Sequence, residues 1–104
     1  MFPILRYKVK GRSMLPNYKE GDYLLINKLS RIQKGDAVVL KHPKTNELIL
    51  KRVSKIKNGR YDVLGDNKNQ STDSRHFGSI SEEMIVGKIL FHIKKDLDYS
   101  ETNK

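Results

Sequence analysis

Two side chains in this sequence carry groups that could break a covalent bond: the hydroxyl of Ser13 and the amine of Lys51. Ser13 lies between Gly11 and Pro16, in a turn that directly follows an alternating strand, so the chain can project its hydroxyl into a cleft. Many ordinary turns look the same, and a serine nucleophile also needs a base. No histidine here has an obvious carboxylate partner. Ser13 by itself therefore predicts a polar turn, and a nucleophile only if another base lies nearby.

Lys51 lies in a strand-like segment in which Ile49, Lys51 and Val53 share one face and Arg52 points to the other. An ordinary lysine has a pKa of about 10.4, so only about one in a few thousand is neutral at pH 7. Desolvation can lower that pKa by about 3–5 units and make the amine a competent base. The alternative is a lysine on an edge strand whose amine reaches back to water. Periodicity alone favours this alternative.

A third feature is the polar segment 65–78, which contains Gly-Asp-Asn and Ser-Thr-Asp-Ser-Arg. Asp73 and Arg75 could form a charge-assisted pair within it. Ser71 or Ser74 could supply a hydroxyl that orients a neutral lysine. Taken alone, the segment predicts an ordered, turn-rich loop.

Short strands must position these groups. Leu5, Tyr7 and Val9 alternate with basic residues, which indicates a half-buried strand. Further strands are expected at 22–29, 36–41, 48–56, 61–64 and 85–93. Asn58-Gly59 predicts a two-residue hairpin, and Ser81 is expected to cap one helical turn over 81–84. We predict a mostly β, mostly antiparallel domain over residues 1–94, followed by a frayed polar tail over 95–104.

Composition excludes several classes of function. The chain of 104 residues has no cysteine, and His42, His76 and His92 show no ligand spacing, so neither a metal nor another cofactor is expected. No pair of amphipathic helices is available for a helix-turn-helix, which argues against a sequence-specific DNA reader.

Charge and hydropathy bear on partners and location. The net charge of +9 favours acidic or anionic surroundings, a membrane face among them, although the lysines form no single block. No segment approaches the roughly 20 apolar residues of a transmembrane helix. The apolar run at the N-terminus is too short for a signal peptide. As written, the chain is expected to be soluble and cytoplasmic, and membrane-associated if an anchor precedes it.

The motifs together resemble a known family. Ser13-Met14-Leu15-Pro16, then Gly21-Asp22, then Lys51-Arg52-Val53 and then segment 65–78 match, in order, the motifs of the type I signal peptidases. These are serine endopeptidases with a serine–lysine dyad. The resemblance runs from about residue 9 to residue 89. Self-cleaving SOS-response repressors share the first motifs but lack the Ser-x-Asp-Ser-Arg loop, so the loop decides the family.

The resemblance implies a fold and a set of roles. The fold would be the small antiparallel β domain of signal peptidases and SOS repressors, a minimal core without the large inserted subdomain. Ser13 would be the nucleophile and Lys51 the general base. Ser71 would hydrogen-bond the lysine, and Asp73 and Arg75 would brace the loop beneath the dyad.

The resemblance also assigns the groups around the reacting carbonyl. The backbone N–H of Ser13 would contribute to the oxyanion hole, and Gly11 stands where some relatives place a serine hydroxyl, so backbone donors would be used instead. Met14 and Pro16 belong to the substrate-binding region of the motif.

The implied substrate is a precursor protein from which an N-terminal extension or signal-type peptide is removed. Small residues would flank the cut, and the substrate would bind as an added strand. Size and the missing anchor resemble the nickel-type superoxide dismutase maturation proteases most. Two alternatives stay open: the catalytic core of a membrane-anchored signal peptidase, and a non-catalytic basic module that binds peptides or nucleic acid. The sequence does not determine the oligomeric state.

Overall fold

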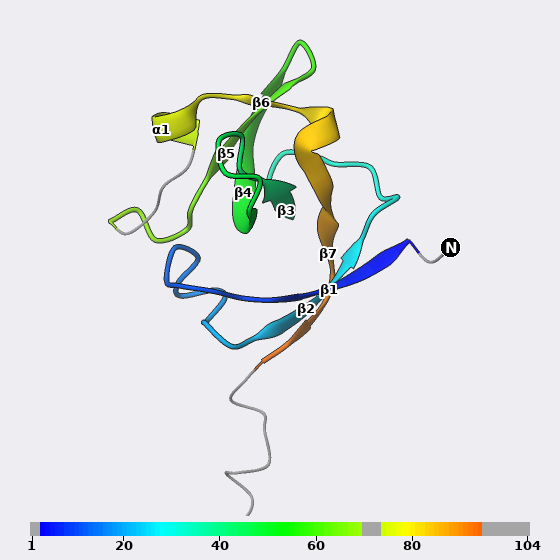
Figure 1. The fold of residues 1–104 in the computed structure, drawn as a ribbon, viewed down its shortest axis with the longest axis vertical. Coiled ribbons are helices and arrows are strands. Elements are labelled where there is room, and N and C mark those ends of the chain that lie inside the picture. The colour runs from blue at the N-terminus through cyan, green and yellow to red at the C-terminus, as the bar shows by residue number, and fades with distance from the viewer. Residues whose placement is uncertain (1–2, 70–73, 95–104) are drawn as a thin grey trace, which may run out of the picture.

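Seven strands build one antiparallel sheet in the computed structural model, which describes residues 3–69 and 74–94. Their order in the sheet is β1-β2-β7-β3-β4-β5-β6, so the last strand inserts between the second and the third (Figure 1). The strands are β1 (Ile4–Lys8), β2 (Tyr23–Asn27), β3 (Ala37–Lys41), β4 (Leu48–Lys57), β5 (Arg60–Leu64), β6 (Ile80–Ser81) and β7 (Ile85–Ile93). The mostly antiparallel β fold that the sequence predicted is therefore confirmed.

The β4–β5 hairpin forms at the predicted position. Asn58 and Gly59 have φ values of 53° and 76°, the left-handed conformations that a tight two-residue hairpin turn requires. The hairpin carries the chain from Lys51 back to Asp66 with no inserted subdomain between them.

Segment 65–78 and its continuation differ from the prediction. A short helix, α1 (Ser74–Phe77), lies within the segment that was expected to be an ordered, turn-rich loop, and the two-residue strand β6, which was not predicted, follows it. The predicted helical turn forms as a 3₁₀ turn, η1 (Glu82–Met84), with Ser81 at its N-cap position. The Ser81 side chain makes no capping hydrogen bond, so that part of the prediction is wrong. Ser81 also belongs to β6, where its backbone pairs with Arg60. The predicted tail, residues 95–104, lies outside the described residues.

The core consists of two apolar clusters on opposite faces of β3. Val39 belongs to the first cluster, with Tyr7, Leu24, Ile26 and Leu50. The second cluster contains the following buried residues: Val38, Leu40, Val53, Tyr61, Val63 and Ile80. Because β3 is buried on both faces, its sequence Ala-Val-Val-Leu shows no alternation.

Curling of the sheet positions the site. Strand β1 lies at one edge and β4 lies four places along, yet Tyr7 and Leu50 pack in the same cluster. The segment that follows β1 is thereby placed next to the middle of β4. The two predicted catalytic residues come from these two segments.

Candidate active site

The turn that carries Ser13 is closed by backbone hydrogen bonds at its base. The N–H of Val9 donates to the Asp22 carbonyl at 2.8 Å, and the N–H of Gly21 donates to the Val9 carbonyl at 2.9 Å. Gly11 has a φ of +74°, a left-handed conformation that favours glycine. The predicted turn after β1 is thus a tightly closed loop with Ser13, half-buried, near its tip.

Met14 fixes this turn to the core. Its side chain is 1 % exposed and packs in the cluster that contains Leu24 and Leu50. The N–H of Asp66 donates to the Met14 sulfur at 3.4 Å. One residue after the serine, the chain is therefore anchored both to the apolar core and to the segment that follows β5.

Asn67 holds the same turn from the other side. Its N–H donates to the Ser13 carbonyl at 2.8 Å, and its side-chain amide donates to the Arg12 carbonyl at 3.0 Å. These bonds join segments more than fifty residues apart in sequence. They restrict the position of the Ser13 backbone.

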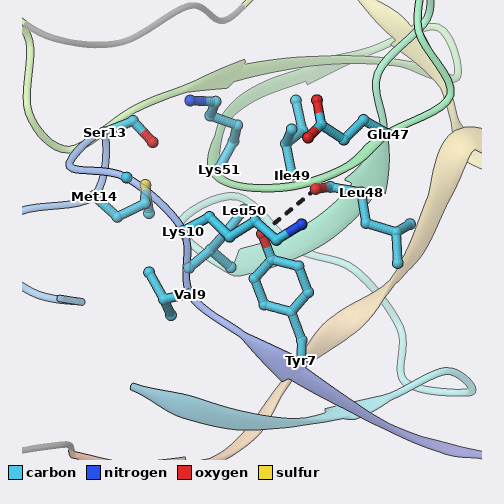
Figure 2. Close-up of a pocket in the computed structure, with 11 residues that line it drawn as sticks. Tyr7, Val9, Lys10, Ser13, Met14, Glu47, Leu48, Ile49, Leu50 and Lys51 are labelled. Carbon is cyan, nitrogen blue, oxygen red and sulfur yellow. Dashed lines mark hydrogen bonds between the residues drawn. The ribbon is translucent and has the colours of Figure 1, made fainter. Parts of the chain in front are cut away.

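Lys51 is buried in the middle of the sheet. Lys51 is 4 % exposed. Its strand, β4, lies between β3 and β5, and Lys51 pairs with Val38 of β3. The reading as an edge-strand lysine that reaches water is therefore wrong, because the strand has neighbours on both sides. Figure 2 shows the Lys51 side chain running from β4 toward the Ser13 turn.

Ser13 and Lys51 line one cleft of about 200 Å³ between the end of β1 and the start of β4 (Figure 2). Its other lining residues are Tyr7, Val9, Lys10, Gly11, Met14, Glu47, Leu48, Ile49 and Leu50. Gly11 and Met14 of the predicted set thus lie at the cleft. Pro16 is exposed and is not among the lining residues.

Tyr7 brings a phenol into this cleft. Burial, and secondarily the charge of Glu47, raises the pKa of Tyr7 to about 12. The hydroxyl donates a long hydrogen bond, 3.5 Å, to the Leu48 carbonyl. Tyr7 is 8% exposed, so its phenol is largely withdrawn from water at this end of the cleft.

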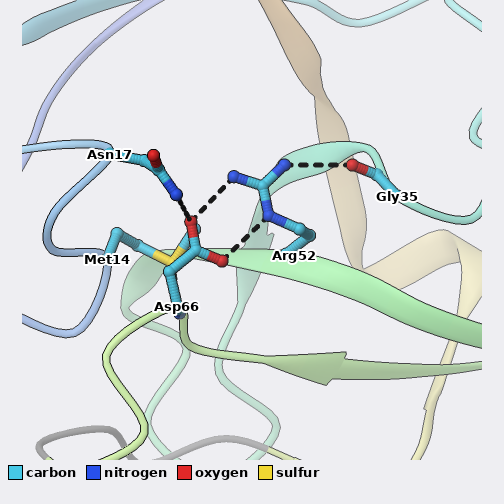
Figure 3. A network of polar contacts seen from close by, with 5 residues as sticks. All are labelled: Met14, Asn17, Gly35, Arg52 and Asp66. Atoms are coloured by element: carbon cyan, nitrogen blue, oxygen red, sulfur yellow. Dashed lines mark hydrogen bonds and ion pairs between the residues drawn. The ribbon is translucent and has the colours of Figure 1, made fainter.

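Arg52 and Asp66 form a bidentate ion pair behind the Ser13 turn (Figure 3). Arg52 donates through Nε at 2.8 Å and through Nη2 at 2.7 Å to the two carboxylate oxygens of Asp66. The Asn17 amide donates to Asp66 at 2.8 Å, and Arg52 also donates to the Gly35 carbonyl at 3.0 Å. The network joins the Ser13 turn, β4 and the segment after β5.

The ion pair sets the protonation of both partners. Burial alone would raise the pKa of Asp66, but the hydrogen bonds from Arg52 and Asn17 and the Arg52 charge hold that pKa below its ordinary value. The hydrogen bond to Asp66 raises the pKa of Arg52. Strand parity placed Arg52 on the face away from Lys51, but the ion pair with Asp66 was not predicted. Two features of the sequence could have suggested this pair: an arginine next to the candidate base, and an aspartate in the Gly-Asp-Asn motif.

A second buried carboxylate lies at the base of the loop. Asp22, 1 % exposed, accepts a hydrogen bond from the Lys19 N–H at 2.9 Å and lies 2.8 Å from Nε2 of His92. The His92 ring packs on Tyr18, with 4.8 Å between the ring centroids. The spacing of His92 from the other histidines argued against a metal ligand, and no other role was predicted for it. A polar residue at an inward position of an apolar strand was the signal that could have identified it.

Three predicted residues remain, and the structure describes only one of them. Ser71 and Asp73 lie outside the described residues. Arg75 is exposed in α1. The predicted hydroxyl partner of Lys51 and the predicted brace of the loop therefore stay predictions.

The structure also bears on metal binding and on membrane-spanning helices. Within residues 3–69 and 74–94, no group of three or more histidine or acidic side chains is arranged to hold a metal ion. In the same ranges, no helix has the length and apolar character that crossing a membrane requires.

Most of the chain is similar to known proteins. The family model described as Peptidase S24-like matches residues 4–90. Signal peptidase I V of Bacillus subtilis (strain 168) is 31% identical over an alignment of 138 residues, which covers 80% of this chain and 82% of that protein. Signal peptidase IB of Staphylococcus aureus is 28% identical over 149 residues, covering 86% of this chain and 78% of that protein.

Proposed function

Because the chain belongs to the Peptidase S24-like family and is a peptidase of the signal peptidase I type, we propose that Ser13 is its nucleophile and Lys51 its general base. The observation that carries the proposal is the burial of Lys51, 4 % exposed, at a cleft that Ser13 also lines. A buried amine beside a serine is the pairing that a serine–lysine dyad needs.

The surroundings of Lys51 favour an amine that can accept a proton. Leaving water disfavours the charged form of a lysine, because the ammonium loses its hydration. On the neighbouring β4 positions, Ile49 and Leu50 line the same cleft, and Leu50 is buried. A neutral Lys51 amine could then take the proton of the Ser13 hydroxyl.

The proposed reaction has two stages. Ser13 Oγ attacks the scissile carbonyl while Lys51 takes its proton, and the tetrahedral intermediate collapses when that proton passes to the leaving amine. The acyl group is now bound to Ser13 as an ester. Lys51 next takes a proton from water, the hydroxide attacks the ester, and the proton returns to Ser13 Oγ as the new carboxylic acid leaves and loses its own proton to solvent.

Backbone donors would stabilise the oxyanion. The Ser13 N–H belongs to the turn that Met14 and Asn67 anchor, so its direction is set before substrate arrives. Preorganised donors of this kind are each worth a few kcal/mol of barrier, about 3. Gly11 lines the cleft without a side chain, and its φ of +74° suits glycine better than serine.

The proposed substrate is a precursor protein with an N-terminal extension. The cleft is small, about 200 Å³, which suits small side chains near the cut. The names of the two relatives favour a signal-peptide precursor. The extension of a nickel superoxide dismutase precursor is the other substrate that we propose to test.

The test is peptide cleavage by the wild type, Ser13→Ala and Lys51→Ala, with both precursor peptides as substrates. Ser30→Ala and Lys57→Ala are matched controls, since Ser30 is half-buried in a loop and Lys57 is exposed at the far end of β4. Mass spectrometry identifies the fragments. We expect the two site variants to lose about 10³-fold or more in rate while both controls keep it.

Circular dichroism shows whether each variant is folded. Folded Ser13→Ala or Lys51→Ala that cuts as fast as the wild type would overturn the dyad. If no variant and no wild-type protein cuts either peptide, but both peptides bind, the non-catalytic binding module is the better description.

A further inference from the structure

Three side chains at the start of β4 stand in a row along the cleft. Glu47, which directly precedes the strand, Ile49 and Lys51 are two residues apart, and alternate residues of a strand share one face. All three line the cleft, and Figure 2 shows them on the same side of the chain. The row is straight, because β4 pairs with β3 without a register shift from Leu48 to Arg52. The amine and the carboxylate thus mark two points of one binding surface.

The spacing of this row fits an extended peptide. Each residue of a β-strand advances the chain by about 3.3 Å, so the backbone of Glu47 lies roughly 13 Å from that of Lys51. A substrate that binds as a strand beside β4 advances at the same rate. When the residue whose carbonyl is attacked lies at Lys51, the substrate residue four positions away therefore lies at Glu47.

Backbone hydrogen bonds fix the place of Glu47. The N–H of His42 donates to the Glu47 carbonyl at 2.8 Å, and the N–H of Glu47 donates to the Thr45 hydroxyl at 3.2 Å. The N–H of Asn46 donates to the His42 carbonyl at 2.9 Å. These bonds close the turn between β3 and β4, so the backbone that carries the Glu47 carboxylate is held before a substrate arrives.

The Glu47 carboxylate is accessible to a ligand. The residue is exposed, and within residues 3–69 and 74–94 no hydrogen bond or ion pair holds its side chain. Its charge acts inside the cleft, because it adds to burial in raising the pKa of Tyr7, another lining residue. Of the described residues that line the cleft, Glu47 alone is acidic, although the whole chain has a net charge of +9.

Lys10 brings an exposed charge of the opposite sign to the same cleft. It belongs to the segment after β1 and lines the cleft from that side (Figure 2). In the described part of the chain, it forms no ion pair with Glu47. The Lys10 amine opposes the attraction that the Glu47 carboxylate exerts on a cation. Removing one charge or the other should therefore change the binding of a charged substrate residue in opposite directions.

We propose that Glu47 is a specificity-determining residue that selects lysine or arginine four positions from the substrate residue whose carbonyl is attacked. The inference rests on the proposed protease function, and it narrows the substrate class to precursors with a basic residue at that spacing. As the substrate strand binds beside β4, its ammonium or guanidinium group pairs with the Glu47 carboxylate.

The experiment measures kcat/KM for matched peptides cleaved by the whole chain. One series carries lysine, glutamine or glutamate at the fourth position from the residue at the cut. The second series carries them at the third position, where a strand turns the side chain to its other face. Both series are made on each side of the cut. We expect lysine at the fourth position on one side to give a value about two- to fivefold higher than glutamine, and salt to weaken this preference. The third position should show no such preference.

Variants assign the preference to Glu47. Glu47→Gln should abolish the preference for lysine over glutamine, and Glu47→Lys should reverse it in favour of glutamate. Lys10→Gln should strengthen it. Glu83→Gln is the matched control, because Glu83 is exposed in η1 and does not line the cleft. A lysine preference that survives in Glu47→Gln, or that Glu83→Gln lowers equally, would overturn the inference.

Failure of this inference is distinct from failure of the proposed function. If the wild type cleaves the lysine and glutamine peptides equally well, the protease function stands and Glu47 does not select the substrate. If the wild type cleaves no peptide, the protease function fails, and fluorescence polarisation then compares binding of the same peptides. Tighter binding of the lysine peptide that Glu47→Gln abolishes would support the role of Glu47. Equal binding of the lysine and glutamine peptides would overturn it.

Discussion

The two sides of β1, β2 and β7 are both rich in apolar residues but differ in what covers them. On the inner side, Tyr7 is 8% exposed and Leu24 and Ile26 are fully buried. On the outer side, Phe91 and Ile93 are at least half exposed. The inner side faces β3 and β4 because the sheet curls, and no described element covers the outer side. Because both sides of these strands carry hydrophobic residues, the sequence leaves open which side becomes the core, and the topology of the sheet decides it.

The largest effect that tests this comparison comes from two neighbouring leucines. Leu24→Ala removes a fully buried side chain from the inner side, and we expect a loss of about 2–5 kcal/mol in the free energy of unfolding. Leu25→Ala makes the same change on the half-buried outer side and should lose about 1 kcal/mol or less. Chemical denaturation measures both. Equal losses would mean that the outer side is also packed in solution.

A smaller difference is expected for charged groups. Asp66→Asn removes the negative charge and one of the two oxygens that accept three hydrogen bonds behind the Ser13 turn, so we expect a loss of about 1–3 kcal/mol in unfolding free energy. Arg6→Gln on the outer side loses only an exposed contact with Tyr23 and should change stability by about 0.5–1 kcal/mol at most.

The pH dependence of stability checks the same pair. The folded-state pKa of Asp66 lies below its ordinary value of 3.8, so its contribution is present above that pH and is lost as the pH falls through the folded-state pKa. Asp66→Asn should flatten the acid limb of the stability profile, and Arg6→Gln should leave it in place. An unchanged acid limb in Asp66→Asn would contradict the assignment.

The smallest expected effect concerns Tyr7. Its pKa of about 12, against an ordinary 10.0, gives a contribution to stability that is present below pH 10 and is lost as the pH rises through the folded-state pKa. Tyr7→Phe should remove the tyrosine that ionises last in a spectrophotometric titration and lower stability by about 1 kcal/mol or less. If the late step persists in Tyr7→Phe, another tyrosine carries it.

Local rules predicted the strands and the direction of several side chains. The alternation around Tyr7 and the Asn58-Gly59 pair each depend on backbone geometry within a few residues, and the structure confirms both. The parity of β4 also placed Lys51 with Val53, and both are buried. The Ser81 side chain makes no capping hydrogen bond although Ser81 stands at the N-cap position, and the pairing of Ser81 with Arg60 is a contact that local rules do not include.

The burial of Lys51 was decided by tertiary structure. Periodicity alone favoured a lysine at a sheet edge, but β3 and β5 flank β4 on both sides. The Arg52–Asp66 and Asp22–His92 contacts join residues 14 and 70 positions apart, and the second exists because β7 inserts beside β2. Pairings of this kind depend on strand order, which no local pattern specifies.

The sequence by itself determined the six longer strands, the hairpin turn and the family motifs, because these depend on residue type and short spacing. Tertiary structure alone decided that Ser13 and Lys51 line one cleft, that Asp66 and Asn67 hold the Ser13 turn, and that one of two apolar sides stays uncovered. The physical reason is that burial is a property of neighbours. A side chain leaves water only when the chain folds another segment over it.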